Sequence, residues 1–106
     1  MSKITIISSQ RYINDGIVEQ KRESKDYVVA LSPAFEIDGM TVQVVLDGHH
    51  SLEAARLDNV DTEYYEQNVR DNDTIALLDS GNIDDFMSTH RLDSDWYNVE
   101  TGNDIW

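Results

Sequence analysis

A chain of 106 residues without cysteine has the size of one domain, and it excludes disulfide bonds, thiolate zinc sites and cysteine nucleophiles. Its net charge of −13 is unevenly distributed, because residues 1–25 carry five basic and three acidic side chains while the remainder carries three basic and eighteen acidic ones. Such a surface repels nucleic acid, and no apolar run is long enough for a membrane span or a signal peptide.

We therefore expect one cytoplasmic domain over residues 1–106 that contacts neither nucleic acid nor membrane. Its first predicted element is a strand over Lys3–Ile7, where isoleucines alternate with threonine. The stretch Gln10–Lys25 has weak periodicity and many charges, so we expect a loop with at most a short helical turn over Val18–Ser24. Tyr27–Leu31 has the aromatic and β-branched content of a strand.

A hairpin is predicted next, around the dipeptide Asp38-Gly39. This dipeptide is the strongest short hairpin signal, and it predicts antiparallel pairing of Phe35–Ile37 with Met40–Leu46. The second arm leads directly into Asp47-Gly48-His49-His50-Ser51, and the period then changes to that of a helix over Ser51–Leu57.

The second half of the chain contains three further predicted elements. Thr62–Val69 is most simply a short strand returning beside the hairpin, with a helix as the alternative. Helices are expected over Ile75–Asp79 and Ile83–His90; in the latter, apolar residues recur at spacings of three and four. The predicted fold class is α/β (α+β), with a small mixed sheet and helices packed on one face.

Polar groups are concentrated in one turn after the hairpin. The box of residues 47–51 presents a carboxylate, two imidazoles and a hydroxyl at the start of a helix, whose free N–H groups attract anions. Candidates for acid/base chemistry are Asp47, His49, His50 and Glu53, and an ordinary strand-to-helix turn capped by Asp47 or Ser51 is the alternative. Adjacent histidines diverge in direction, so we predict no metal site.

The sequence Asp47-Gly48-His49-His50-Ser51 after a strand resembles the second conserved box of the ParB/sulfiredoxin superfamily, usually Asp-Gly-His-His-Arg. The resemblance covers about a fifth of the chain and implies a ParB/sulfiredoxin-like fold. It also implies that Gly48, His49, His50 and Ser51 lie against the phosphates of a nucleotide with magnesium, since relatives bind CTP, ATP or ADP there. Ser51 replaces the usual arginine and so removes the cation that offsets phosphate charge. Sulfiredoxin chemistry itself needs a cysteine, which the chain lacks.

The acidic C-terminal half indicates a basic protein partner or, alternatively, serves solubility. The tail over residues 93–106 contains both tryptophans, which either cover a sheet edge or act as anchors at a protein interface. The candidate partner-binding residues are acidic or aromatic: Asp84, Asp85, Asp93, Asp95, Trp96, Tyr97 and Trp106.

Two functions remain open at this point. The first is a small acidic binding protein without enzymatic activity, such as an immunity protein, antitoxin or phage-type inhibitor, on a degenerate ParB/sulfiredoxin-like fold. The second is a nucleotide- or phosphate-binding domain with weak ATPase, CTPase or kinase-type activity at the box. The charge, the aromatic tail and the serine at position 51 favour binding over catalysis.

Overall fold

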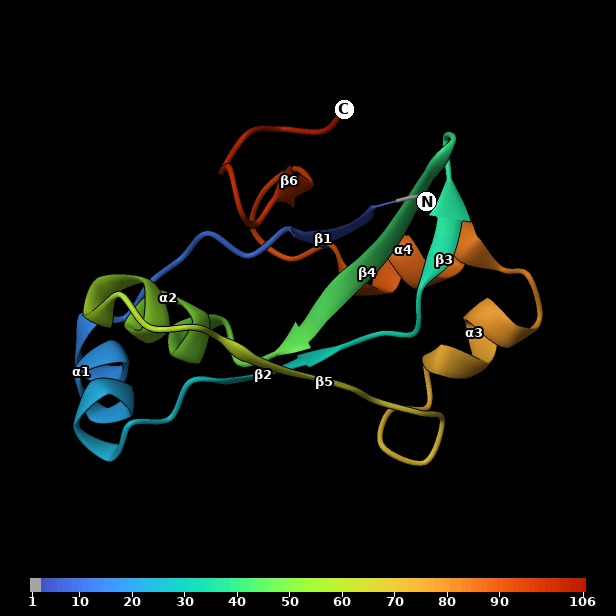
Figure 1. Ribbon diagram of the computed structural model, residues 1–106. Helices are drawn as coiled ribbons and strands as arrows, with labels where there is room; N and C mark the ends of the chain where they lie inside the picture. Colours follow the sequence, from blue (N-terminus) through green and yellow to red (C-terminus); the bar gives the residue numbers. More distant parts are fainter. Residues whose placement is uncertain (1–2) are drawn as a thin grey trace.

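Strand β4 (Met40–Asp47) is the centre of the sheet in the computed structural model, which describes residues 3–106 (Figure 1). It pairs in parallel with β1 and antiparallel with β2 and β3, and the strand order is β5-β2-β4-β1-β6, with β3 also on β4. The result is a mixed α+β fold, as predicted. The other elements are β1 (Ile4–Ser8), α1 (Asp15–Ser24), β2 (Val28–Leu31), β3 (Phe35–Ile37), α2 (His49–Asp58), β5 (Glu63–Glu66), α3 (Ile75–Asp79), α4 (Ile83–His90) and β6 (Tyr97–Asn98).

The predicted hairpin is confirmed. Residues Phe35 and Ile37 of β3 pair with Val42 and Met40 of β4. Asp38 and Gly39 have φ angles of 50° and 77°, and positive φ at both central positions is typical of the turn whose twist matches the flanking strands. The hairpin therefore fixes which face of β4 points into the core.

The main core lies between that face and the helices α3 and α4. Ile7, Val42 and Val44 from the sheet and Phe86 from α4 are fully buried. The ring of Phe86 meets the ring of Phe35 edge to face at 5.8 Å. Both helices have the predicted limits, because their apolar residues recur at helical spacing. The helices α1 and α2 instead form a separate pair at the other end of the sheet (Figure 1).

The prediction of a loop over Gln10–Lys25 was wrong for most of this stretch, although the short helical stretch considered over Val18–Ser24 lies within a helix. Residues Asp15–Ser24 form α1, capped at its start by the Asn14 side chain, which accepts a hydrogen bond from the Ile17 N–H at 3.2 Å. Only Val18 of this helix is buried, because its sequence contains almost no apolar face. Packing against α2 therefore stabilises α1, and the local pattern did not reveal it.

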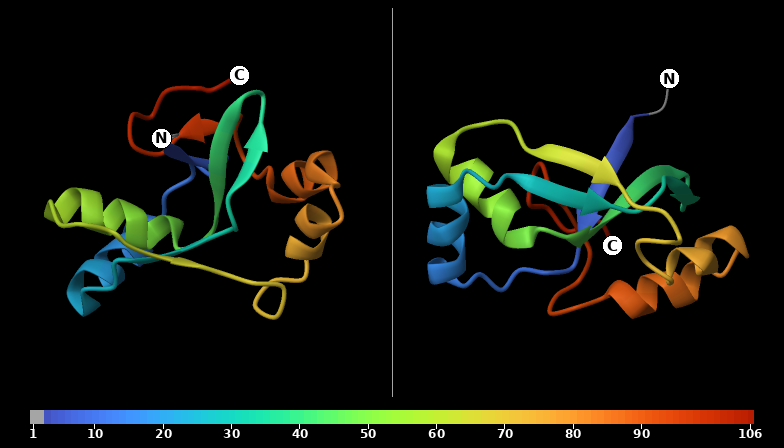
Figure 2. Two further views of the ribbon diagram at one scale, coloured as in Figure 1. Left: turned by 45° about the vertical axis from the view of Figure 1, so that its right-hand side comes forward. Right: turned by 90° about the horizontal axis from the view of Figure 1, so that it is seen from below.

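The strand predicted over Thr62–Val69 is present as β5, but it does not lie beside the hairpin as we expected. It pairs in parallel with β2, with Val28 opposite Glu63 and Leu31 opposite Glu66, and forms one edge of the sheet. The two strands run side by side when the molecule is seen from below (Figure 2). The prediction placed this strand wrongly because its glutamates and tyrosines do not define an inner face.

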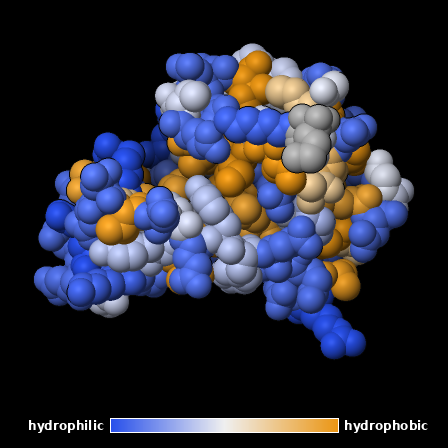
Figure 3. Space-filling view, viewed as in Figure 1, coloured by the Kyte–Doolittle hydropathy of each residue, from blue (hydrophilic) through white to orange (hydrophobic). Residues whose placement is uncertain are grey.

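The tail covers the opposite edge of the sheet. Strand β6 pairs antiparallel with β1, and Trp96 and Tyr97 are both buried in the domain. Trp106 is 49 % exposed. Apolar side chains gather in the middle of the face shown in Figure 3, whereas the surface of α1 and α2 on the left is largely hydrophilic. Within residues 3–106, no helix combines the length and hydrophobicity needed to cross a membrane.

Candidate functional site

The box joins the end of β4 to the start of α2 through Gly48. Its φ is 95°, and an added Cβ would lie 2.6 Å from the Val28 carbonyl oxygen and 2.9 Å from the Cα of Val29. Only glycine tolerates both the angle and the close approach of β2. Helix α2 begins at His49, two residues before the predicted start, so both histidines belong to its first turn.

The side chains of the box point to different parts of the molecule. Asp47 Oδ1 accepts a hydrogen bond from the Gly48 N–H at 2.8 Å, and His50 Nε2 accepts one from the Asn14 N–H at 3.2 Å. Ser51 is 1 % exposed, and its hydroxyl donates to Asp26 at 3.3 Å. The predicted site residues are therefore neighbours in sequence, but their side chains do not converge on one point. Acid/base catalysis would require such convergence.

Asp26 adds negative charge beside this turn. Its carboxylate also accepts hydrogen bonds from Lys21 Nζ at 3.0 Å and from the Val28 N–H at 3.2 Å. The hydrogen bond from Lys21, followed by that from the backbone of Val28, holds the pKa of Asp26 below its usual value. A carboxylate therefore lies near Ser51, where the resemblance would require a cation.

His49 is the least satisfied polar side chain of the box. It is 8 % exposed, and neither ring nitrogen has a hydrogen-bond partner. Burial lowers the pKa of the imidazole, and the adjacent His50 lowers it further, while Asp93 and Glu53 oppose the shift. His49 is therefore neutral at pH 7, with one potential donor and one potential acceptor unused.

A pocket of about 430 Å³ lies against His49. Tyr64 from β5 and Tyr97 from β6 both line it, so the two edges of the sheet curl toward the same cavity, with α2 between them. Its volume is within the range of small-molecule sites. The remaining lining residues are Arg11, Ile13, Leu52, Glu53, Arg56, Val60, Thr62, Val99, Glu100 and Gly102.

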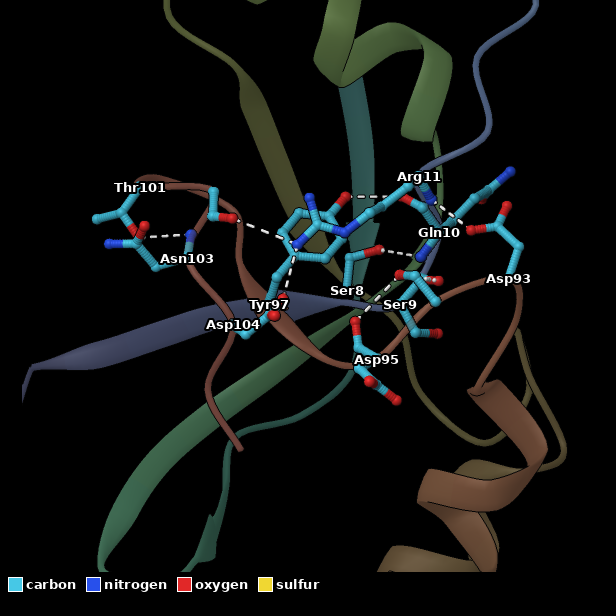
Figure 4. A network of polar contacts seen from close by, with 12 residues as sticks. Ser8, Ser9, Gln10, Arg11, Asp93, Asp95, Tyr97, Thr101, Asn103 and Asp104 are labelled. Atoms are coloured by element: carbon cyan, nitrogen blue, oxygen red, sulfur yellow. Dashed lines mark hydrogen bonds and ion pairs between the residues drawn. The ribbon is translucent and has the colours of Figure 1, made fainter.

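The cations at this pocket are already engaged. Arg11 donates to Asp104 at 3.0 Å and to the Gly102 carbonyl at 3.3 Å, and its guanidinium lies 4.0 Å above the Tyr97 ring (Figure 4). Arg56 is paired with Glu53. A phosphate entering here would have to break these contacts, and Glu53 and Glu100 would repel it.

Several candidate partner-binding residues instead hold the tail on the domain. Asp93 accepts hydrogen bonds from the N–H groups of Arg11 and Tyr12, at 2.6 and 3.1 Å, and the Tyr97 hydroxyl donates to the Gln10 carbonyl at 2.6 Å (Figure 4). Asp95 is paired with Arg91. With Trp96 and Tyr97 buried, the tail acts as a cover for the sheet edge, one of the two roles left open by the sequence.

The remaining candidates are exposed, and Asp84 and Asp85 belong to a stretch of the chain that is rich in exposed acids. Asp84 and Asp85 are exposed in the first turn of α4, and Trp106 is half exposed. Within residues 3–106, no acid from Asp61 to Asp85 takes part in an ion pair. All eight acids are exposed, and only Arg70 has the opposite charge in this stretch; we call them the acidic face: Asp61, Glu63, Glu66, Asp71, Asp73, Asp79, Asp84 and Asp85.

Sequence reasoning missed the part of this face that lies on β5. Tyr64 and Tyr65 are 38 % and 46 % exposed, between Glu63 and Glu66. The available signal was the order Glu-Tyr-Tyr-Glu, which places one glutamate and one tyrosine on each side of a strand and so predicts that neither side is buried.

Comparisons give no relative from which a function could be transferred: no family model, curated protein or solved structure matches the chain. Among residues 3–106, no three His, Asp or Glu side chains are grouped so as to hold a metal ion. Two features of the described residues therefore remain as candidate sites. One is the acidic face, whose acids form no ion pair, and the other is His49 beside its pocket, whose two ring nitrogens form no hydrogen bond.

Proposed function

We propose that the chain is a small acidic binding protein that neutralises or inhibits a basic protein partner, as immunity proteins, antitoxins and phage-type inhibitors do. The observation that carries this proposal is the acidic face, whose eight exposed carboxylates have no ion-pair partner in the described part of the chain. Unpaired charge of one sign repels itself in the monomer and attracts a partner of the opposite sign. The proposed fold relationship is a degenerate ParB/sulfiredoxin-like domain, and the proposed location is the cytoplasm.

The test is affinity capture from the host cytosol at low and high salt, followed by association and dissociation rates on the captured protein. The variant Asp84→Asn with Asp85→Asn should lower mainly the association rate, because long-range steering depends on charge. Its control is Glu23→Gln with Glu36→Gln, which removes two exposed, unpaired acids outside the acidic face and should leave the rate nearly unchanged. Trp106→Ala should raise the dissociation rate if Trp106 is an anchor. Equal effects of the two acidic pairs would contradict the proposal.

A second candidate function is the binding of a nucleotide or another phosphate-bearing ligand at the box, with weak ATPase, CTPase or kinase-type activity. It is favoured by the unpartnered ring of His49 and by the start of α2, which has no side-chain cap. It is opposed by Ser51, which is enclosed beside Asp26 where the family has an arginine.

Thermal unfolding with ATP, ADP, CTP or GTP and magnesium tests this second function. A bound nucleotide should raise the melting temperature by mass action, and His49→Ala with His50→Ala should abolish the rise. The absence of a shift at millimolar nucleotide would eliminate it. Ser51→Arg is not a clean test of gained affinity, because the larger side chain would have to leave the enclosed position of Ser51.

A further inference from the structure

Strand β5 leaves one edge of the sheet open. It pairs with β2 alone, and all four of its residues are exposed. At the opposite end of the sheet, β6 and the tail cover β1, but no strand among the described residues covers the outer side of β5 (Figures 1 and 2). An open edge is a template for another strand.

The hydrogen bonds of β5 identify which backbone groups are available. The Glu63 N–H donates to the Tyr27 carbonyl at 2.9 Å, and the Gln67 N–H donates to the Leu31 carbonyl at 2.8 Å. Because the direction alternates along a strand, the N–H and carbonyl groups of Tyr64 and Glu66 face away from β2. These groups would form the ladder with an added strand.

The charges beside this edge determine which strand fits. A second copy paired antiparallel through the same outward groups would be centred on Tyr65 and would bring Glu66 of each copy opposite Tyr64 of the other. Such a pair would gather Asp61, Glu63 and Glu66 of both copies along one short pair of strands, and this accumulation of negative charge opposes the pairing. Glu63, Glu66 and the nearby Asp61 instead complement a strand that carries lysine or arginine.

Two aromatic rings add apolar contact area to the same edge. Tyr64 and Tyr65 project to opposite sides of β5, and each is more than a third exposed. Exposed tyrosines next to an open edge can pack against aliphatic side chains of an added strand or stack on its cations.

We infer that the open edge of β5 receives an extended basic segment of the partner as an additional strand of the sheet. This inference rests on the proposed function and specifies how the basic partner is held. Main-chain hydrogen bonds to Tyr64 and Glu66 supply affinity, and the flanking acids select positive charge.

The probe is a short, fluorescently labelled peptide of alternating lysine and valine, with the same peptide N-methylated at every residue as the control that cannot form a ladder. The chain should bind the first peptide and bind the second about tenfold more weakly or worse, because each lost hydrogen bond costs about 1 kcal/mol. Equal binding of the two peptides would show attraction by charge alone and overturn the inference.

A matched pair of variants separates the backbone from the charge at one position. Glu66→Gln removes the carboxylate and keeps the N–H, whereas Glu66→Pro also removes an N–H that β2 does not use. Glu66→Pro should bind the peptide several-fold more weakly than Glu66→Gln, with the same circular dichroism spectrum. Equal affinities of the two variants would overturn the inference while leaving the proposed function in place.

Amide hydrogen exchange gives a second readout that does not depend on a variant folding. Binding of the peptide should slow exchange at Tyr64 and Glu66, while Tyr65, whose N–H faces β2, should change little. Unchanged exchange at Tyr64 and Glu66 in the saturated complex would contradict strand addition. If the Asp84 and Asp85 variant also associates with the captured partner at the wild-type rate, the proposed function fails as well.

Discussion

His49 and His90 are both enclosed imidazoles, but only one has a hydrogen-bond partner. The Nε2 atom of His90 lies 2.7 Å from the Thr74 hydroxyl, and its ring packs on Phe86 with centroids 4.6 Å apart. Neither nitrogen of His49 has a partner. Burial lowers the pKa of both side chains. We therefore expect the ring at position 49 to cost stability, whereas the ring at position 90 links Thr74, at the start of α3, to α4.

The first prediction compares these two histidines. His49→Phe should raise the free energy of unfolding by about 1–3 kcal/mol, because it removes a buried polar group without a partner and keeps a flat ring. His90→Phe is the control; it should lower the free energy of unfolding, because it leaves the Thr74 hydroxyl without His90. Urea denaturation at pH 7.5 measures both changes.

The same variants also test how the free energy of unfolding depends on pH. In the unfolded chain histidine takes up a proton near pH 6.5, whereas the lowered pKa keeps His49 and His90 neutral to lower pH in the folded state. The unfolded state thus binds more protons below about pH 6.5, and the histidine contribution to stability is lost as the pH falls. His49→Phe should lose less stability than wild type between about pH 7 and 5; a steeper loss would indicate that His49 has a partner in solution.

At the scale of elements, the joint between β4 and α2 is constrained by packing on β2. An added Cβ at Gly48 would meet the Val28 carbonyl, whereas at Gly81 no atom lies within 4 Å and only the positive φ of 83° opposes a side chain. The two glycines thus share a backbone conformation and differ in the space around it.

The second prediction uses that difference. Gly81→Ala should cost about 1–2 kcal/mol, the price of a left-handed conformation for a residue with a Cβ. Gly48→Ala should cost at least about 2 kcal/mol more, because the joint must also move away from β2. Chemical denaturation measures both variants, and equal losses would mean that the joint adjusts freely.

The limits of α3, α4 and the hairpin could be predicted from the sequence, because their signals are local: helical spacing of apolar residues and the Asp38-Gly39 turn. The full length of helix α1 could not be predicted, and only its part over Val18–Ser24 was considered, since the helix is held by contacts distant in sequence. Asp58 of α2 accepts hydrogen bonds from Arg22 and Tyr27, at 2.6 and 2.7 Å, and these bonds lower its pKa.

The candidate site shows the same division. The position of the box at the start of a helix was predictable, since a strand period changes to a helical one at Gly48. The divergence of His50 and Ser51 toward Asn14 and Asp26 was not, because their partners come from the loop before α1 and the turn after it.

At the scale of the whole molecule, negative charge is concentrated between residues 61 and 85, where eight exposed acids accompany Arg70 alone. All seven ion pairs of the described residues join basic side chains to acids outside the acidic face, whose own acids are left without an ion-pair partner. Net charge far from zero destabilises a compact state through self-repulsion.

The third prediction concerns this self-repulsion. Added sodium chloride should raise the melting temperature of the free protein, because it screens repulsion over a Debye length of about 8 Å at physiological ionic strength. Glu63→Gln with Glu66→Gln should raise the melting temperature at low salt and reduce the effect of salt. Glu19→Gln with Asp58→Asn is the control and should lower it, since both acids are paired with Arg22. A melting temperature that falls with salt would mean that the ion pairs outweigh the repulsion.

The pairing of β1 has a consequence for the time at which the protein can fold during synthesis. This first strand joins β4 and β6, so its second neighbour is made only when Tyr97 leaves the ribosome. The burial of Trp96 and Tyr97 and the part of the pocket wall formed by Tyr97 are completed at the same late step. Strand β5, by contrast, finds its partner β2 about thirty residues earlier in synthesis, so a nascent chain can present its acidic edge before its core is closed.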